Sequence, residues 1–532
     1  MIKDNFFDRE AYLQTIEKRI IGLKDGYRQN LAIIGDELVG KTSIIFKLLN
    51  RFCDNKTIVF YIEARHESYA SFAKRFIGIM LYNFMANSNT PLKEDIDYLK
   101  QKAAKFIPKT VEKIENILGS LEKRKKKDIF TELLFLCELI NQETGKFCVV
   151  VFDEFQNLEN LGLGDFYKEW SKLLLVQKTT MYIIISSQKH KARTILSKQL
   201  SLLFGNFEII NIEPFDTKTS ERYIEERIKL AKPDVNQGIK NFIIHFTGGN
   251  PFYLEIVTEA IIKSNKENLS QILEHLLFDI SGILNQRFSN FMKRFQDIPD
   301  ANEYISILYL VSNGQNKIRD IAHLLKKKQS ELNSKVIRLI EMDTISKNGD
   351  FLKINDRVFG FWLKFVYHGK LNSLTFDSKN QKILFRSNID AAIQDFLLHT
   401  QKPVMQRLME LLHMFEDQTI QLEKKKIRLH QFREIKPLEF GHSALKYGLL
   451  GRSNESLWIM ALKTESITEE DITEFVKECK KFRHKSQRNI IITLNDIDMN
   501  TRLKALEEKI WAWDIDSLNQ IFDLFSRPGV IA

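Results

Sequence analysis

Cysteine is scarce in this chain of 532 residues. The four cysteines, at positions 53, 137, 148 and 479, show no metal-ligand spacing. Cys148 lies within an apolar run, so we expect it to be a small buried hydrophobe. The sequence also lacks any apolar run that approaches the length of a membrane span. At the N-terminus, acidic residues occupy the stretch where a signal peptide would need an apolar core. These absences predict a protein of the reducing cytoplasm with no membrane partner.

Charge of neither sign dominates strongly. The chain has 79 basic and 69 acidic side chains, a formal net charge of +10. Such a balance is consistent with a nucleic-acid partner but does not establish one. Basic runs occur at residues 123–127, 326–328 and 424–426. A solvated helix end or turn explains the first and third runs, whereas the second has a context that favours phosphate contact. The length suggests three or four domains, and the composition is typical of a soluble globular protein.

Residues 35–42, with the sequence GDELVGKT, match the pattern G-x-x-x-x-G-K-[ST]. The apolar run before them predicts a buried strand, and residues 43–49 after them predict a helix. A glycine-rich turn between strand and helix lets backbone N–H groups surround a phosphate chain, and the helix N-terminus adds a partial positive charge. We expect Lys41 to reach the β- and γ-phosphates and the Thr42 hydroxyl to bind magnesium. The segment therefore predicts a nucleotide site.

A second apolar run, residues 148–152, ends in Asp153 and Glu154. The run predicts a buried parallel strand, whose carboxyl end would lie beside the phosphate loop. We expect Asp153 to hold Mg²⁺, directly or through water, and Glu154 to orient and deprotonate the attacking water. The alternative is an Asp-Glu pair that only caps the next helix. The second carboxylate favours hydrolysis over mere nucleotide holding, because it has no need to bind the metal.

Helical patterns alternate with the strands of the first 215 residues, which predicts an α/β fold with a parallel sheet covered on both faces. The expected strands are residues 31–34, 58–62, 148–152, 182–186 and 208–212. The long charged stretch at 70–141 predicts a helical insertion. Ser187 and Gln188 follow the fourth strand, and either could contact the γ-phosphate or the attacking water. A turn that caps the next helix would explain both residues equally well.

The middle of the chain predicts helices at 219–231 and 237–246, separated from the next helix by Gly-Gly-Asn-Pro at 248–251, which a turn alone would explain. Further helices are expected at 304–311, 318–325 and 331–341, followed by a hairpin turn at 348–350. Three helices and a hairpin are the order of a winged helix-turn-helix. The aromatic segment at 359–367 predicts core packing, and residues 371–381 predict a linker.

In this winged helix, residues 326–328 would lie just before the recognition helix, where DNA phosphates pass. Four polar residues could face a groove: Ser330, Asn333, Ser334 and Arg338. Winged helices also serve as protein–protein modules or as lids on ATPases, so DNA contact and protein contact both stay open for this domain.

Five segments carry a resemblance to a known family. They are FDRE at 7–10, GDELVGKT at 35–42, VVVFDEFQ at 149–156, IIISSQ at 183–188 and TGGNPFYL at 247–254. Over about residues 6–365 the chain resembles the archaeal-type ATPase branch of the STAND/AAA+ P-loop enzymes. The resemblance implies a strand order of 5-1-4-3-2, a helical lid and ATP as the nucleotide. It places Arg9 near the adenosine end and brings Gly249-Asn250-Pro251 to the nucleotide from the lid. Arg193 is only a candidate for an arginine finger.

Residues 402–532 resemble the PD-(D/E)xK nuclease-like domain that often ends members of this family. Residues 404–414 would be its first helix, 457–463 the strand that normally carries Glu-x-Lys, 471–482 the next helix and 489–494 a later strand. Ala461 stands where the glutamate is expected, and residues 439–444 offer no convincing aspartate. Because such nucleases need clustered carboxylates for Mg²⁺, Lys463 alone cannot cut DNA, and we expect a degenerate module.

These expectations describe an ATP-binding and hydrolysing switch with five parts: an ATPase domain (1–215), a helical lid (216–300), a winged helix (301–370), a linker (371–401) and a degenerate nuclease-like domain (402–532). Catalysis is expected from Glu154, Lys41 and Ser187, and Mg²⁺ binding from Thr42 and Asp153. The expected ATP-binding residues are Gly35, Asp36, Glu37, Leu38, Val39, Gly40, Lys41, Thr42, Ser43, Arg9 and Pro251.

We expect the nucleotide state to control either DNA association through the winged helix or assembly of a complex. A protein partner or an oligomer is compatible with both outcomes. Three rivals stay open: a nuclease with displaced carboxylates at Glu410 or Glu439, a signalling ATPase that recognises only protein, and a replication-initiator-like loader.

Overall fold

The computed structural model of the chain describes residues 6–52, 54–86, 92–122, 129–200, 207–229, 235–264, 268–371, 378–423, 425–441, 445–482 and 486–530. Cys53, the basic run at 123–127, Lys424 and residues 442–444 lie outside these ranges. By its contacts the chain divides into two units, which are described one at a time. The first comprises residues 1–214 and 250–252, and the second comprises residues 215–249 and 253–532.

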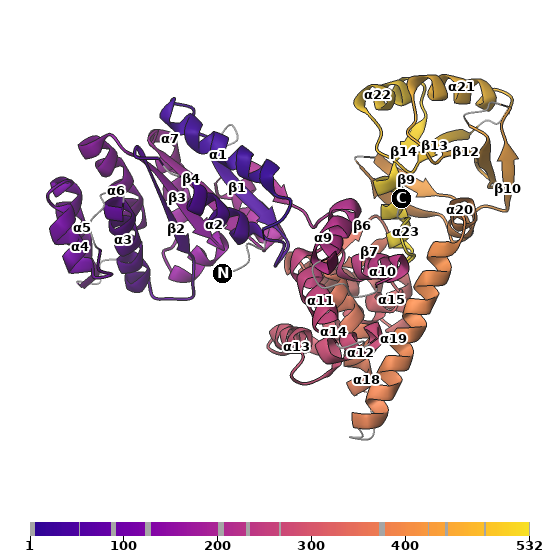
Figure 1. Cartoon of the computed structure of the whole chain (residues 1–532), viewed down its shortest axis with the longest axis horizontal. Helices are drawn as coiled ribbons and strands as arrows, with labels where there is room; N and C mark the ends of the chain where they lie inside the picture. The colour runs from indigo at the N-terminus through magenta and orange to yellow at the C-terminus, as the bar shows by residue number, and fades with distance from the viewer. Residues whose placement is uncertain are drawn as a thin grey trace. The chain divides into compact units, whose positions relative to one another are not determined.

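The first unit is built on one parallel sheet (Figure 1). Its strands are β1 (Asn30–Gly35), β2 (Thr57–Glu63), β3 (Phe147–Asp153), β4 (Thr180–Ser186) and β5 (Phe207–Ile212). They correspond to the five predicted strands, each extended by one or two residues. Their order is β2-β3-β4-β1-β5, which is 5-1-4-3-2 when read from the other edge. The carboxyl ends of β1, β3 and β4 therefore meet at one edge of the sheet.

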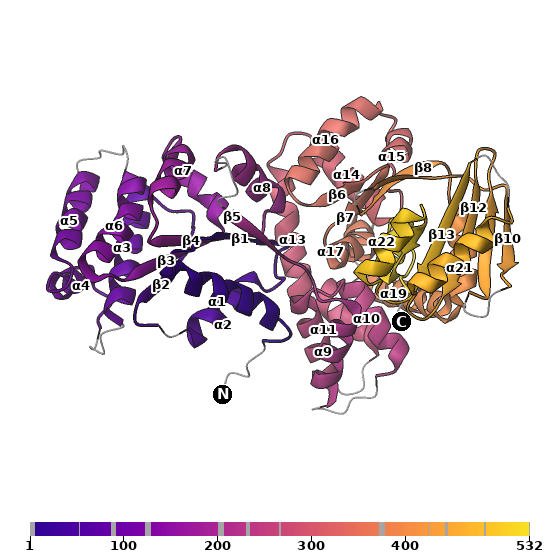
Figure 2. The same ribbon diagram turned by 90° about the horizontal axis from the view of Figure 1, so that it is seen from above.

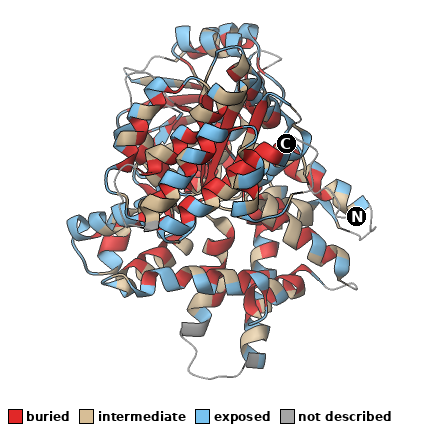
Figure 3. Ribbon diagram, turned by 90° about the vertical axis from the view of Figure 1, so that its left-hand side faces the viewer, coloured by how far each residue is buried: buried red, intermediate tan, exposed pale blue. Residues whose placement is uncertain are grey.

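Helices cover both faces of this sheet (Figure 2). One face packs against α1 (Glu10–Lys24) and α2 (Lys41–Arg51). The other packs against α3 (Tyr69–Ala86), α6 (Ile129–Thr144), α7 (Phe166–Val176) and α8 (Lys189–Lys198), with α4 (Ile96–Ala103) and α5 (Pro108–Glu122) beyond them. Successive residues of β1 alternate between the two cores, as the period of a strand requires. Figure 3 shows how buried residues concentrate in this sheet.

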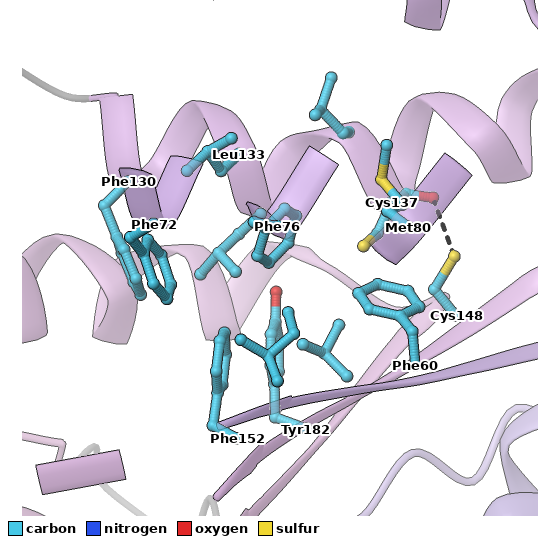
Figure 4. Packing of buried hydrophobic residues seen from close by; sticks show 14 of the residues in the cluster. Phe60, Phe72, Phe76, Met80, Phe130, Leu133, Cys137, Cys148, Phe152 and Tyr182 are labelled. Atoms are coloured by element: carbon cyan, nitrogen blue, oxygen red, sulfur yellow. Dashed lines mark hydrogen bonds between the residues drawn. The ribbon is translucent and has the colours of Figure 1, made fainter. Parts of the chain in front are cut away.

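The larger of the two cores is rich in aromatic rings. Phe60, Phe76, Phe130 and Phe152 contact one another there, and the Tyr182 hydroxyl lies among them (Figure 4). Cys148 is buried in this core, as expected, and its thiol faces the Cys137 carbonyl at 3.8 Å. The insertion predicted at 70–141 thus supplies α3 to α6, which together with α7 and α8 cover one side of the sheet.

The second unit begins with a helical region. Its elements are α9 (Thr217–Lys229), α10 (Gln237–Thr247), α11 (Pro251–Lys263), α12 (Leu269–Leu273), the π-turn η2 (Glu274–Phe278) and α13 (Ile283–Gln296). Next come α14 (Ala301–Ser312), α15 (Ile318–Leu324), α16 (Gln329–Glu341) and the hairpin β6 (Ile345–Asn348) and β7 (Phe351–Ile354). The three helices and the hairpin were all predicted. The segment then continues through α17 (Arg357–Trp362), η3 (Leu363–Tyr367) and α18 (His368–Leu371).

Most of the stretch expected to be a linker, residues 371–401, is the long helix α19 (Ser378–Gln401). Its buried residues are Phe385, Ile389, Ile393 and Phe396, a spacing that places them on one helical face. Arg386 and Lys382 of α19 form ion pairs with Glu274, a buried carboxylate of η2. The segment is therefore a helix packed against the helical region, because its apolar stripe and its cations both find partners there.

A second, mixed sheet follows α20 (Val404–His413) and the hairpin β8 (Gln418–Leu422) and β9 (Lys425–Leu429). Its strands are β10 (Glu434–Glu439), β11 (Tyr447–Arg452), β12 (Leu457–Lys463), β13 (Gln487–Thr493) and β14 (Trp511–Trp513). The first three run antiparallel, whereas β13 and β14 are parallel to β12. The helices are α21 (Glu469–Cys479), α22 (Met499–Glu507) and α23 (Ile515–Leu524).

The strand that precedes β12 is β11, not residues 439–444 as expected from the sequence. Glu439 instead ends β10. The error has a simple cause, since β10 and β11 are largely exposed or glycine-containing and give a weak apolar signal. Among the described residues, no helix is both long enough and apolar enough to cross a bilayer.

Candidate active site

The turn between β1 and α2 has the backbone of a phosphate loop. Leu38 and Gly40 both have left-handed φ angles, +62° and +97°. Gly40 is the last residue before α2, where that conformation favours glycine. Gly35 is needed for another reason, because a β-carbon there would lie 2.4 Å from the Ile212 carbonyl oxygen of β5. The two glycines of the motif are thus required by the loop conformation and by the neighbouring strand.

Lys41 is folded back over this loop. Its Nζ donates to the carbonyl oxygens of Gly35, at 3.0 Å, and Asp36, at 2.7 Å. Burial lowers the pKa of this ammonium, although the nearby Glu154 and Asp153 carboxylates act in the opposite direction. A buried ammonium that donates to carbonyl oxygens can donate to anionic oxygens instead when these are present.

Thr42 and Asp153, the two expected magnesium ligands, lie together. The Thr42 hydroxyl donates to Asp153 Oδ2 at 2.7 Å. Mg²⁺ is usually held by one or two carboxylates, with phosphate oxygens and water completing its shell. One hydroxyl and one carboxylate beside a phosphate loop fit that pattern, and among the described residues there is no cluster of three metal-ligating acidic, His or Cys side chains. The pair therefore suits a metal that arrives with a nucleotide.

Tyr61 of β2 also holds Asp153, which the sequence gave no reason to expect. Its hydroxyl donates to Asp153 Oδ2 at 2.6 Å. Burial and this hydrogen bond raise the pKa of the Tyr61 phenol above its ordinary value, so the phenol remains a donor at neutral pH. Asp153 Oδ1 in turn accepts the backbone N–H of Glu154 at 2.9 Å. The Asp153 carboxylate is thus fixed from three sides.

Glu154 follows directly, in a left-handed conformation with φ +49°. Its Oε2 accepts Gln156 Nε2 at 2.6 Å and the Ser187 backbone N–H at 3.2 Å. Ser187, a predicted site residue, therefore reaches Glu154 through its main chain. The adjacent Ser186 hydroxyl donates to Gln156 Oε1 at 2.7 Å. The ends of β3 and β4 are joined around the Glu154 carboxylate.

Arg9 and Asn250 approach the loop from outside the strand–helix unit. Arg9 Nη2 donates to the Glu213 carbonyl at 2.7 Å and lies 3.5 Å from the Val39 carbonyl oxygen. Asn250 Nδ2 donates to the Glu37 carbonyl at 3.2 Å. Pro251, predicted as a nucleotide contact, is the first residue of α11 and is next to Asn250 in the chain. Asn250 itself was named only as part of the Gly-x-Pro segment.

Not every predicted residue is drawn into this cluster. Arg193 of α8, the candidate arginine finger, donates to Asn211 Oδ1 at 3.1 Å on an exposed surface. Asp36 pairs with Lys189 at 2.6 Å. Of the residues that sequence reasoning missed, Gln156 and Asn250 lie inside segments that had been singled out, whereas Tyr61 lies in an ordinary strand pattern.

This arrangement has the strand–loop–helix geometry of a P-loop. Residues 6–257 match the family model described as an ATPase domain predominantly from Archaea. This part of the chain is therefore similar to archaeal-type ATPase domains.

Individual proteins are also similar to this chain. A curated protein of Methanocaldococcus jannaschii, described as an uncharacterized ATP-binding protein, is 23% identical over 329 residues, 55% of this chain and 87% of the relative. Among solved structures, the Walker-type ATPase of Pyrococcus abyssi matches with a TM-score of 0.50 and 18% identity, over 68% of this chain and 97% of that chain. The ORC2 protein of Aeropyrum pernix matches with a TM-score of 0.38 and 9% identity, over 73% of this chain and 95% of that chain.

Proposed function

We propose that this chain is an ATP-hydrolysing molecular switch whose nucleotide state controls DNA association or assembly of a larger complex. The observation that carries the hydrolytic part is the position of Glu154. Its carboxylate follows the Thr42–Asp153 pair at the end of β3 and is held by Gln156 and Ser187. A carboxylate that is oriented but not used as the metal ligand is suited to a general base.

Each residue has a distinct role in this proposal. Lys41 exchanges its two loop carbonyls for the β- and γ-phosphate oxygens of ATP, while the backbone N–H groups of residues 35–43 surround the phosphates. Thr42 and Asp153 hold Mg²⁺, which neutralises charge on the phosphates when bound. Glu154 takes the proton of the attacking water. Arg9 contacts the adenosine side.

The same site offers a route for the switch. Asn250 belongs by its contacts to the first unit, and the residues on both sides of the 250–252 segment belong to the second. A change at the phosphate loop that shifts the Glu37 carbonyl would alter its hydrogen bond with Asn250. The displacement would then pass along the chain to Gly249, which ends one part of the second unit, and to Tyr253, which begins the other.

For the output, the helix-and-hairpin segment 301–370 supports a winged helix. Ser330, Asn333, Ser334 and Arg338 of α16 are exposed, as a DNA-reading helix requires. Lys327, however, pairs with Glu303 at 2.8 Å, which reduces the positive charge available to phosphates. DNA contact through α16 remains the proposal, with Lys326 and Lys328 as the exposed cations beside it.

A specific observation favours the second candidate output, recognition of protein rather than DNA. The hairpin turn at 348–350, which would be the wing, is bonded to β8. Asn348 exchanges two hydrogen bonds with Gln421, and Asp350 exchanges two with Thr419. A wing whose tip is already bonded to another part of its own chain is less available to a DNA groove, which favours the protein-recognition output.

The strand topology supports a nuclease-like fold for residues 402–532, since an antiparallel β10-β11-β12 meander leads through α21 to the parallel strand β13. The site does not support cleavage. Ala461 is buried with Gly448 opposite it on β11. Lys463 is paired with Asp471 at 2.7 Å, and although burial alone would raise the pKa of that carboxyl, Lys463 and Thr468 lower it. We therefore propose that the domain formed by residues 402–532 binds nucleic acid or a protein partner without cutting DNA.

Two substitutions test the hydrolytic function. Lys41→Ala should abolish ATP binding or turnover, since one cation balances the phosphates. Glu154→Gln should retain bound ATP but slow turnover by about 10²–10⁴-fold, the usual contribution of a general base. Glu159→Gln is the matched control, because Glu159 also follows β3 but pairs with Lys191, at 2.7 Å. Wild-type turnover in Lys41→Ala or Glu154→Gln would contradict the assignment.

A further inference from the structure

Gln156 occupies an unusual place beside the active site. It is 1% exposed, and its neighbour Ser186 is 0% exposed. The left-handed turn at Glu154 ends β3 and starts a 3₁₀ helix, η1 (Phe155–Leu161). Because of this turn, the side chain two residues later returns to the Glu154 carboxylate. A buried amide is costly unless both of its polar ends are bonded, and both are bonded here.

The hydrogen bonds run in one direction. The Gln188 backbone N–H donates to Ser186 Oγ at 3.1 Å, and the Ser186 hydroxyl donates to Gln156 Oε1 at 2.7 Å. Gln156 Nε2 then donates to Glu154 Oε2 at 2.6 Å. If the amide were turned over, Gln156 Oε1 would face a carboxylate oxygen, which is repulsive, so the Glu154 carboxylate fixes the orientation of the amide and Ser186 donates to its other end. The shorter hydrogen bond of the Ser186 hydroxyl is thus directed toward Glu154, whereas the Gln188 carbonyl oxygen lies farther from this hydroxyl, at 3.3 Å.

We propose that Gln156 is a positioning residue for ATP hydrolysis: it orients the Glu154 carboxylate and, through Ser186, ties that carboxylate to the turn that follows β4. The inference rests on the proposed function and deepens it. The turn after β4 contains Ser187, the candidate contact of the γ-phosphate or the attacking water. The relay therefore joins that turn to the base, so that a change in one alters the geometry of the other.

A purely structural role would give a different result. If Gln156 only filled space and satisfied Ser186, its loss would reduce stability and nucleotide binding together. If it acts through Glu154, its loss reduces kcat, leaves nucleotide affinity intact, and has no effect once Glu154 can no longer act as a base.

The test uses the full chain, with kcat and KM measured by steady-state ATP turnover and nucleotide affinity by calorimetric titration with ADP. Gln156→Met preserves side-chain length without hydrogen bonds, and we expect kcat to fall by about 10-fold or more at unchanged ADP affinity, a partial loss of the base contribution. Ser186→Ala, a gentler change, should lower kcat in the same direction. In a Glu154→Gln background, Gln156→Met should cause no further loss, because residues that act as a unit are not additive.

Gln177→Met is the matched control. Gln177 is also a buried amide, 2% exposed, bonded to the Leu134 carbonyl and the Tyr182 hydroxyl, but it precedes β4 and is therefore remote from Glu154. Its replacement should lower stability without a selective fall in kcat. Unchanged kcat in Gln156→Met, or an equal loss in the Glu154→Gln background, would overturn this inference alone. Absence of turnover in the wild-type chain would overturn the proposed function as well.

Discussion

Gly249→Ala should destabilise the second unit far more than the same change at its neighbour. Gly249 has φ +73°, and a β-carbon there would lie 2.0 Å from the Phe215 carbonyl oxygen, a backbone atom that cannot move alone. A left-handed alanine costs about 1–2 kcal/mol, and forced overpacking costs a further ~1–3 kcal/mol. The change also strains the hydrogen bond from the Phe215 N–H to the Gly249 carbonyl, at 2.9 Å. The free energy of unfolding should therefore fall by about 2–5 kcal/mol.

Gly248→Ala is the control. Gly248 has a similar φ of +61°, but its β-carbon would meet the Arg357 side chain, with Cδ nearest at 3.1 Å, and a long flexible side chain can shift. We expect a loss of about 1–2 kcal/mol, from the backbone conformation alone.

The assay is urea unfolding followed by tryptophan fluorescence. The chain has five tryptophans, of which Trp362, Trp458, Trp511 and Trp513 lie in the second unit, so the signal reports mainly on that unit. Gly249 directly precedes Asn250, so ADP affinity should fall in the same variant. Equal losses in the two alanine variants would refute the close approach to Phe215 as the cause.

Three other predictions follow from the second unit. Burial, and then the Arg357 guanidinium, lower the pKa of His245 from 6.5 to about 3. At this histidine the unfolded chain then binds one more proton than the folded chain between these pH values. Its titration should therefore contribute a fall in unfolding free energy of about 1.4 kcal/mol per pH unit on acidification, a contribution that His245→Gln should remove. Reversing residues 326–328 to glutamate should weaken DNA binding and flatten its salt dependence, whereas an unchanged affinity and slope would favour protein recognition. The purified chain should not nick supercoiled plasmid with Mg²⁺ or Mn²⁺; nicking that is lost on Lys463→Ala would show a surviving nuclease site.

The first unit could be predicted closely from the sequence, because its signals are local and agree with one another. The strands of a parallel sheet covered on both faces are continuous apolar runs, and each such run was found. The phosphate loop and the Asp153-Glu154 pair each sit at the end of one of these runs, so their meeting at one sheet edge followed from topology.

The C-terminal sheet was predicted only where strands are buried. The bounds of β12 were predicted without error, and those of β13 to within two residues at its start and one at its end. The hairpin β8–β9 and the strands β10 and β11 were missed, since their residues alternate between exposed and buried or lie at an edge. Such strands are stabilised by cross-strand partners, which a local pattern does not reveal.

The side chains that hold the Asp153 and Glu154 carboxylates were the hardest to foresee, and Tyr61 shows what was missing. The strand order implied by the resemblance made β2 and β3 neighbours. It did not say which residues of the two strands face one another. In the structure Glu63 pairs with Asp153, and Tyr61, two residues earlier, shares its face of the sheet. Only that register brings the phenol to Asp153; a slip by one residue would turn it to the opposite face. The contact between the Gln156 side chain and the Glu154 carboxylate depends similarly on the left-handed φ angle of Glu154. Residue types and spacing thus brought out the groups to which the proposed chemistry is assigned, whereas the groups that orient them depend on register and on a single backbone angle.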